Sequence, residues 1–135
     1  MAHWLLKTEP STYSFDTLEK EGRAVWDGVT NPVALRNLKQ AAVGDQIVVY
    51  HTGDERAAVG WAEVVGAAYP DPKAQDPRLV VIDIAPRGRL KNPVNLATLK
   101  AHPGFRESPL VRQGRLSVVP LSAEQWAELK RLAGG

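Results

Sequence analysis

The alternation of apolar and polar positions predicts a chain rich in short strands. Each predicted strand is a run of branched, aliphatic or aromatic residues bounded by polar, glycine or proline positions. These runs are residues 4–9, 46–51, 57–65 and 79–84, with a last strand after the glycine turn at 112–115. The polar loop 52–56 joins two of them as a hairpin. Three prolines within residues 69–77 predict an irregular loop, and Arg87-Gly88-Arg89 predicts a turn.

Other segments carry the spacing and end signals of helices. They are residues 15–21, 32–42 and 95–101, and a C-terminal segment after Ser122. Ser14 and Gly22 suit the two ends of the first helix, and Pro32 suits the first turn of the second. Ser122 and Gln125 fit a capping box for the last helix.

The order of these elements indicates an α+β fold. Strands come as hairpins rather than in regular strand-helix-strand alternation, which favours a small, mostly antiparallel barrel or sheet with helices at its ends. The chain has 135 residues and shows no internal repeat, low-complexity tract or linker. We therefore expect residues 1–135 to form one domain.

Composition excludes several classes of function. The chain has no cysteine, which rules out disulfides, thiolate metal sites and a cysteine nucleophile. The three histidines lack metal-ligand spacing, and no glycine-rich nucleotide loop is present, so we expect no metal and no cofactor. No apolar run approaches membrane-spanning length, and the N-terminus has no signal pattern. We expect a cytoplasmic protein, nucleoid association included, without a membrane partner, and we favour a monomer.

Charge is distributed unevenly along the chain. The formal net charge is +2, yet the segment 86–120 holds seven basic residues against one acid, Glu107. A basic segment on an otherwise acidic body indicates a polyanionic partner such as nucleic acid. The alternative is that these cations are scattered over the surface, and the sequence leaves that open.

The segment Val25-Trp26-Asp27-Gly28-Val29-Thr30-Asn31 is the strongest candidate for a binding site. Gly28 permits a sharp bend after Trp26, and Asn31 offers a donor and an acceptor on one short side chain. An indole beside these groups suits a planar, polar ring. On local sequence alone, Trp26 is more readily interpreted as a core residue at a turn.

Residue patterns typical of active sites and of nucleic-acid-binding sites, compared with this sequence, favour nucleic-acid binding over catalysis. Ser11 and Ser117 lack the glycine context of a nucleophile elbow, which leaves Asp27 with His51 as the best acid-base pair for an enzyme. Aromatic residues interleaved with basic ones suit an exposed base held by stacking while cations hold phosphates. A pocket with one indole and a few short polar groups would fit a single extruded base.

Several ordered motifs resemble the EVE domain family over nearly the whole chain. The matching segments are Trp4–Pro10, Tyr13-Ser14, Trp26–Val29 with Asn31, Val43–Asp45, Tyr50-His51, Gly60 with Ala62–Val64, Tyr69–Pro72 and Leu110–Val118. The resemblance implies a PUA-like fold, a five- to six-stranded β-barrel with flanking helices. It also implies a reader of modified bases, chiefly methylated or oxidised cytosines in DNA, similar to the YTH domains that bind methylated adenine in RNA.

The resemblance also implies which residues form the site. By position, Lys7, Thr8 and Trp26 match the YTH residues that line the base pocket. Further candidates for ligand binding are Asn31, Tyr50, His51 and Ser117, with Arg112 and Arg115 for backbone phosphates. The chain departs from the usual family pattern at Thr30, Pro32 and Trp61, where the family more often has arginine, an aromatic and a small aliphatic residue.

The leading hypothesis is a non-catalytic module that accepts one flipped, modified base, and the base it names is a modified cytosine in DNA. Trp26 would stack on the base, Asn31, Thr8 and Ser117 would read its polar edge, and Lys7, Arg112 and Arg115 would hold phosphate. Two alternatives remain: an RNA-binding accessory domain of PUA type, and an enzyme on a modified nucleotide that uses Asp27 and His51.

Overall fold

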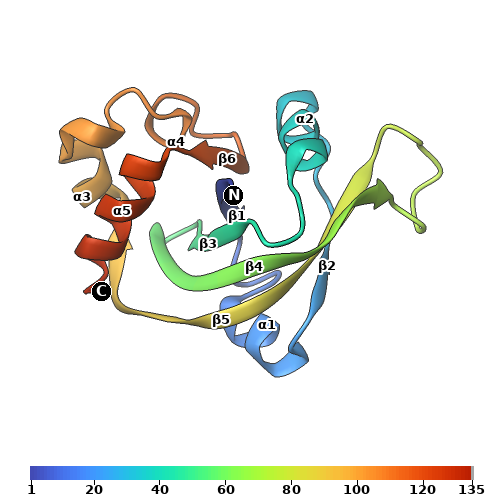
Figure 1. The fold of residues 1–135 in the computed structure, drawn as a ribbon, viewed down its shortest axis with the longest axis horizontal. Helices are drawn as coiled ribbons and strands as arrows, with labels where there is room; N and C mark the ends of the chain where they lie inside the picture. The colour runs from blue at the N-terminus through green and yellow to red at the C-terminus, as the bar shows by residue number, and fades with distance from the viewer. Residues whose placement is uncertain (135) are drawn as a thin grey trace.

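A computed structural model describes residues 1–134 as one mixed sheet with helices around it (Figure 1). The strands are β1 (His3–Thr8), β2 (Ala24–Trp26), β3 (Gln46–His51), β4 (Ala57–Pro70), β5 (Val80–Asn95) and β6 (Val118–Leu121). The helices are α1 (Phe15–Glu21), α2 (Pro32–Gln40), α3 (Leu96–Ala101), α4 (Pro109–Arg112) and α5 (Ala123–Leu132), with a 3-10 turn at Pro103–Phe105. No helix within the described residues is long and apolar enough to cross a membrane.

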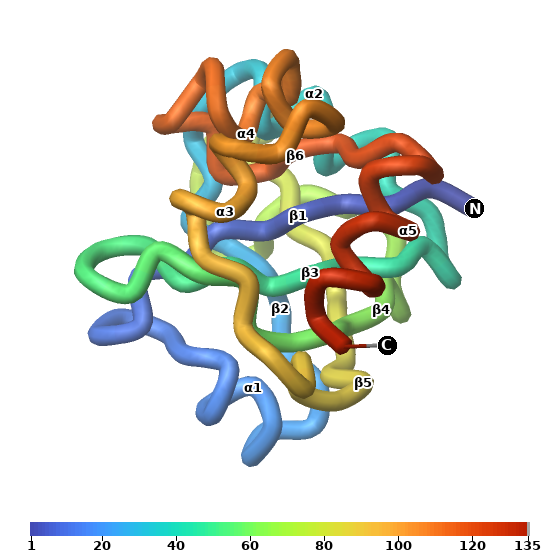
Figure 2. Tube along the Cα trace, turned by 90° about the vertical axis from the view of Figure 1, so that its left-hand side faces the viewer, coloured from blue at the N-terminus to red at the C-terminus, as the bar shows by residue number. Residues whose placement is uncertain are grey.

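The six strands form an open sheet in the order β2-β5-β4-β3-β1-β6. The β1–β3 pair is parallel and the other four pairs are antiparallel, so the predicted α+β, mostly antiparallel architecture is confirmed. The predicted barrel closure is not found, because β2 and β6 are the two edges and do not pair with each other. Figure 2 shows β1 and β3 side by side, with α5 packed over one end of the sheet.

Helix ends lie where capping side chains set them. Ser14 and Gly22 bound α1, and the side chain of Ser14 accepts a hydrogen bond from the backbone N–H of Thr17. Ser122 and Gln125 form the predicted capping box of α5. These local signals act within one turn of the chain, which is why the sequence predicts them well.

The strands β4 and β5 are longer than predicted. The sequence predicts a turn at Arg87-Gly88-Arg89 and an irregular loop from Tyr69, but β5 continues through the first and β4 extends to Pro70. Their pairing shifts register at several points, among them between Ala58 and Gly60. Such bulges let a strand bend around glycine and proline without ending. Figure 1 shows the two strands running together across the molecule as a long curved ribbon.

The core packs one glycine tightly against an aromatic ring. Phe15 begins α1 and is fully buried, and Gly60 of β4 lies directly against its ring. A side chain at residue 60 would overlap the ring atoms of Phe15. This contact fixes how closely α1 approaches the sheet, and therefore where the chain that follows α1 enters β2.

A buried carboxylate ties the N-terminus to the start of β3. Asp45 accepts hydrogen bonds from the backbone N–H of Ala2 and the indole N–H of Trp4, both at 3.0 Å, and from the N–H of Ala42 at 2.9 Å. Burial alone would raise the pKa of Asp45, but these donors favour the carboxylate and hold its pKa below the ordinary value. The charged form therefore stabilises the fold.

We expect Gly60→Ala to destabilise the protein by about 1–3 kcal/mol, since overpacking forces Phe15 or the backbone to move. Urea unfolding followed by circular dichroism measures the change. Gly114→Ala is the matched control, because a methyl group there meets no atom of the described residues within 4 Å. Equal stability of the two variants would contradict the close packing.

We expect Asp45→Asn to cost about 2 kcal/mol at pH 7, because a carboxylate accepting several N–H groups is replaced by an amide that offers its own donor. The pKa of Asp45 is lowered on folding, so its contribution is present above the ordinary Asp pKa and is lost as pH falls through the folded value. The stability gap between wild type and variant should thus narrow at acidic pH. A gap independent of pH would contradict this role.

Candidate functional site

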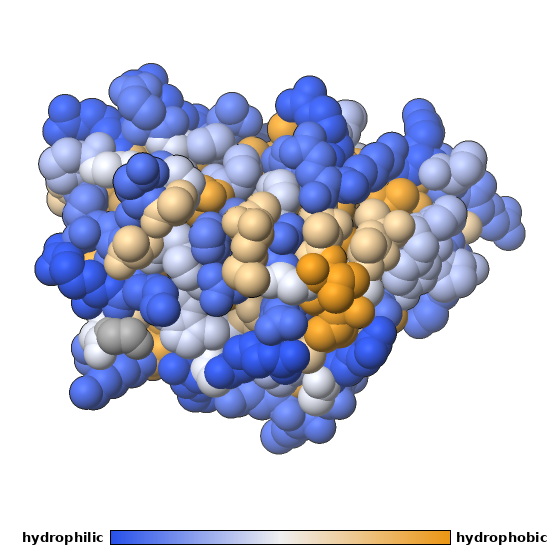
Figure 3. All heavy atoms as spheres, viewed as in Figure 1, coloured by the Kyte–Doolittle hydropathy of each residue, from blue (hydrophilic) through white to orange (hydrophobic). Residues whose placement is uncertain are grey.

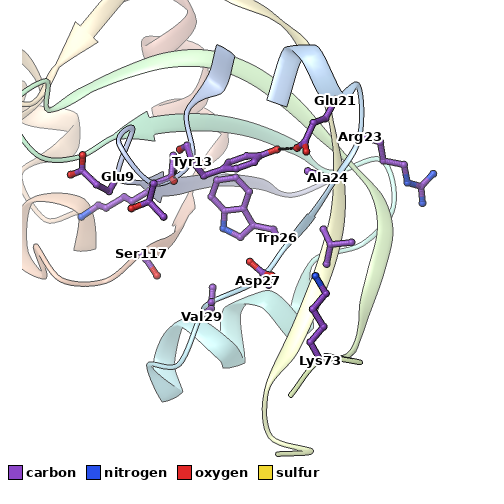
Figure 4. Close-up of a pocket in the computed structure, with 15 residues that line it drawn as sticks. Glu9, Tyr13, Glu21, Arg23, Ala24, Trp26, Asp27, Val29, Lys73 and Ser117 are labelled. Atoms are coloured by element: carbon purple, nitrogen blue, oxygen red, sulfur yellow. Dashed lines mark hydrogen bonds between the residues drawn. The ribbon is translucent and has the colours of Figure 1, made fainter. Parts of the chain in front are cut away.

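A cavity of about 680 Å³ opens where β1 ends, beside β2 and the loop that follows it. Fifteen residues line it (Figure 4): Lys7, Thr8, Glu9, Thr12, Tyr13, Glu21, Arg23, Ala24, Val25, Trp26, Asp27, Gly28, Val29, Lys73 and Ser117. The volume lies in the range of small-molecule sites, and the lining combines aromatic, hydroxyl and charged groups.

Trp26 lines the cavity and also belongs to the core. It ends the edge strand β2, pairs with Ile82 of β5 and is only 7% exposed. The ring of Tyr13 stands edge-on to its indole, with centroids 6.1 Å apart and planes at 87°. Figure 4 shows the two rings together at one side of the cavity. Packing thus fixes the orientation of the indole, which is what a stacking surface requires.

The loop after Trp26 bends as its sequence predicts. Gly28 has a φ of 77°, a left-handed conformation that most side chains disfavour. Asp27 and Val29 lie on either side of it, and both line the cavity with Gly28. The bend therefore places a carboxylate and a backbone turn next to the indole.

The end of β1 contributes Lys7 and Thr8, both predicted site residues. The Lys7 ammonium donates to the carbonyl of Gly114 at 3.0 Å, and burial lowers its pKa from the ordinary value. The Thr8 hydroxyl donates to the carbonyl of Tyr13 at 2.7 Å, which leaves its oxygen able to accept.

Ser117, the fourth predicted residue in the cavity, is held by the same strand. Its carbonyl accepts from the backbone N–H of Lys7 at 2.9 Å. The cavity therefore brings together Lys7, Thr8, Trp26 and Ser117 from three separate parts of the chain.

Asn31 and Tyr50 lie outside the cavity lining. The side-chain oxygen of Asn31 accepts from the backbone N–H groups of Val33 and Ala34, at 2.9 and 3.1 Å, and so caps α2. Tyr50 is 3% exposed, with the Lys7 ammonium 5.9 Å from its ring centroid. Both residues contact elements next to the cavity. Asn31 caps the helix that follows the loop, and Tyr50 lies beneath Lys7.

His51 is a structural residue of the described fold. Its Nε2 accepts from the backbone N–H of Phe15 at 3.0 Å, and its Nδ1 lies 3.0 Å from the carboxylate of Glu55. The predicted pairing of Asp27 with His51 is therefore wrong, since Glu55 is the acid beside His51 and the imidazole lies outside the cavity lining. Nε2 thus joins α1 to β3, and Nδ1 joins β3 to the loop that follows it.

The cations of the segment 86–120 are spread over the molecule rather than gathered in one patch. Arg89 pairs with Asp16 and Glu19 of α1, whereas Arg112 pairs with Glu107 at 2.8 Å at the α4 end. Figure 1 places α1 and α4 on opposite sides of the sheet. Arg112 and Arg115 are exposed but do not line the cavity.

Six polar residues of the lining have no site role predicted from the sequence: Glu9, Thr12, Tyr13, Glu21, Arg23 and Lys73. Tyr13 donates from its hydroxyl to Glu21, and burial, followed by Glu21 and Asp27, raises its pKa. Arg23 pairs with Asp83 at 2.8 Å. Lys73 extends from the β4–β5 loop toward the side of the cavity where Asp27 lies (Figure 4). Tyr13 stands in a quoted motif, but nothing in the sequence brings Lys73 to this place.

Trp61, one of the departures from the family pattern, packs away from the cavity. The rings of Trp61 and Trp126 of α5 have centroids 5.1 Å apart and planes at 62°. The ring of His3 also stacks on Trp126. Trp61 therefore fills space between the sheet and α5. No group of acidic and histidine side chains within residues 1–134 is arranged to hold a metal ion.

Comparison with known proteins gives a consistent result. The model of the EVE domain family matches residues 2–132. Human thymocyte nuclear protein 1 is 26% identical over 93% of this chain and 71% of its own length. The solution structure of Rpa0253 from Rhodopseudomonas palustris is 37% identical, with a TM-score of 0.93 and coverage of 99% of this chain and 94% of that one.

A ligand-bound structure shares the fold. Human THYN1 in complex with DNA containing 5-methylcytosine has a TM-score of 0.92 and 24% identity, covering 100% of this chain and 99% of that one. The family model spans nearly the whole sequence, and the quoted motifs occur in order along it. The chain therefore belongs to the EVE domain family.

Proposed function

We propose that the protein binds nucleic acid through a single modified base, a modified cytosine of DNA, that leaves the stack and enters the cavity. The observation that carries the proposal is the rigid Trp26 indole at a cavity lined by hydroxyl, carboxylate and ammonium groups. The human relative bound to 5-methylcytosine DNA supports the same ligand class. An aromatic wall with a few hydrogen-bonding groups is how proteins hold an extruded base.

Three side chains are placed to read the polar edge of the base. Thr8 and Ser117 each offer a hydroxyl oxygen, and the carboxylate of Asp27 can accept from an exocyclic amino group. Cytosine carries such an amino group at its N4 position. Asp27 therefore takes the reading role that the sequence analysis gave to Asn31.

Two ammonium groups suit the phosphate of the same nucleotide. Lys7 is held at the cavity by the Gly114 carbonyl, and Lys73 is exposed on the β4–β5 loop. Arg23 is less available, because its guanidinium already pairs with Asp83. Lys7 and Lys73 would then neutralise the phosphate, whose negative charge the acids of the cavity would otherwise repel.

We also propose that the protein binds without catalysis. The support is the arrangement of His51, the side chain on which the enzymatic alternative depended. Its two nitrogens are engaged by Phe15 and Glu55. An imidazole used in this way is not free to exchange protons with a ligand in the cavity.

We expect Trp26→Phe and Trp26→Ala to weaken binding of a duplex that carries one central 5-methylcytosine. Loss of base–aromatic stacking is worth about 1–3 kcal/mol for the alanine change, or roughly 5- to 150-fold in Kd, and less for phenylalanine. Fluorescence anisotropy of the labelled duplex measures Kd.

Trp61→Phe serves as the matched control, because Trp61 packs on Trp126 outside the cavity. Circular dichroism checks that each variant is folded. If Trp26→Ala does not fold, the test uses Trp26→Phe, which keeps an aromatic residue in the core. Unchanged affinity in a folded Trp26→Phe and Trp26→Ala pair would contradict the proposed site.

A further inference from the structure

A second hollow of about 560 Å³ is lined by two segments that follow residues of the cavity lining along the chain. Residues 28–29 line the cavity, and the hollow begins at Thr30. On the β4–β5 loop, Lys73 lines the cavity while Asp76 to Leu79 border the hollow. We call this hollow the α2 groove; its lining is Thr30, Pro32, Leu35, Arg36, Lys39, Asp76, Arg78 and Leu79.

Helix α2 presents one face to the α2 groove and buries the opposite one. Pro32, Leu35, Arg36 and Lys39 recur at helical spacing and line the groove. On the other face, Ala34 and Leu38 are buried, and the Asn37 amide donates to the Val118 carbonyl at 2.8 Å. The helix is therefore fixed to the core with its cationic face outward. Figure 3 shows hydrophilic side chains along the upper edge of the molecule, where Figure 1 places α2.

The α2 groove is more positive than the cavity. Three cations and one acid line the groove, whereas three cations and three acids line the cavity. Arg36 and Lys39 are exposed, and no ion pair within residues 1–134 involves either of them. Arg78 pairs with Asp76 at 2.8 Å, but its side chain remains 84% exposed. This charge is complementary to an anionic chain.

We propose that the α2 groove holds the sugar-phosphate backbone of the nucleotides that adjoin the extruded base. The inference rests on the proposed function of the cavity. It adds the direction in which the nucleic-acid strand leaves the cavity, which is into the α2 groove. Arg36, Lys39 and Arg78 contact phosphates, and Leu35 and Leu79 form an apolar floor against the sugars. Contacts of this kind position a strand without reading its sequence.

The cavity and the α2 groove have separate roles in binding. A base in the cavity is read by Asp27, Thr8 and Ser117, whereas the α2 groove contributes affinity that depends on salt and on strand length. A free nucleoside therefore uses the cavity alone. An oligonucleotide uses both, which makes the two roles separable by experiment.

The test compares Arg36→Gln/Lys39→Gln with Lys100→Gln/Lys130→Gln, a control pair that removes the same charge from exposed positions on α3 and α5. Kd for the labelled 5-methylcytosine duplex is measured by anisotropy from 50 to 200 mM salt. Two lost phosphate contacts should reduce the slope of log K against log salt by about 2. The affinity gap to wild type should then narrow roughly tenfold across that range.

Binding of free 5-methyl-2′-deoxycytidine, followed by NMR, should be the same in both double variants. The inference is overturned if the groove variant matches the control variant in duplex affinity and salt slope. Failure of the Trp26 variants to weaken duplex binding would instead overturn the proposed function. Weakening by Trp26→Ala with no effect of the groove variant would reject the strand direction alone.

Discussion

The pairing of β1 between β3 and β6 is the constraint on which the rest of the structure depends. Residues Trp4, Leu5 and Leu6 are buried on both faces of this strand, so its position is fixed by apolar packing as well as by the backbone ladder. The strand ends at Thr8 with Lys7 and Thr8 at one wall of the cavity. The Lys7 backbone also holds Ser117, so one strand orders three of the groups proposed to meet the ligand.

Local signals in the sequence were sufficient to predict most of the fold. Capping residues such as Ser14 and Ser122 set helix ends, and branched runs such as residues 46–51 set strands. Prediction from the sequence fails where tertiary pairing overrides a local strand-breaking residue, as at Gly88, which lies inside β5. It could not decide closure of the sheet either, since whether β2 meets β6 depends on twist and bulges summed over all the strands.

The candidate site was predicted in part, and for reasons that differ between residues. Lys7, Thr8, Trp26 and Ser117 meet at the cavity, and the resemblance to the family placed them there by position. Asn31 has the right chemistry for reading a base, but Pro32 starts a helix after it and its amide oxygen serves as the cap. Lys73 and Arg36 could not be placed, because their contribution depends on how the β4–β5 loop and α2 lie in space.

The central claim is that the ligand lies against Trp26, and the indole N–H signals of the protein test it directly. The chain has four tryptophans, which give one indole resonance each in a two-dimensional NMR spectrum. On titration with 5-methyl-2′-deoxycytidine, the account predicts that the Trp26 resonance shifts while those of Trp61 and Trp126, which pack on each other outside the cavity, stay in place. A ligand that shifts other resonances and leaves Trp26 unmoved would contradict it.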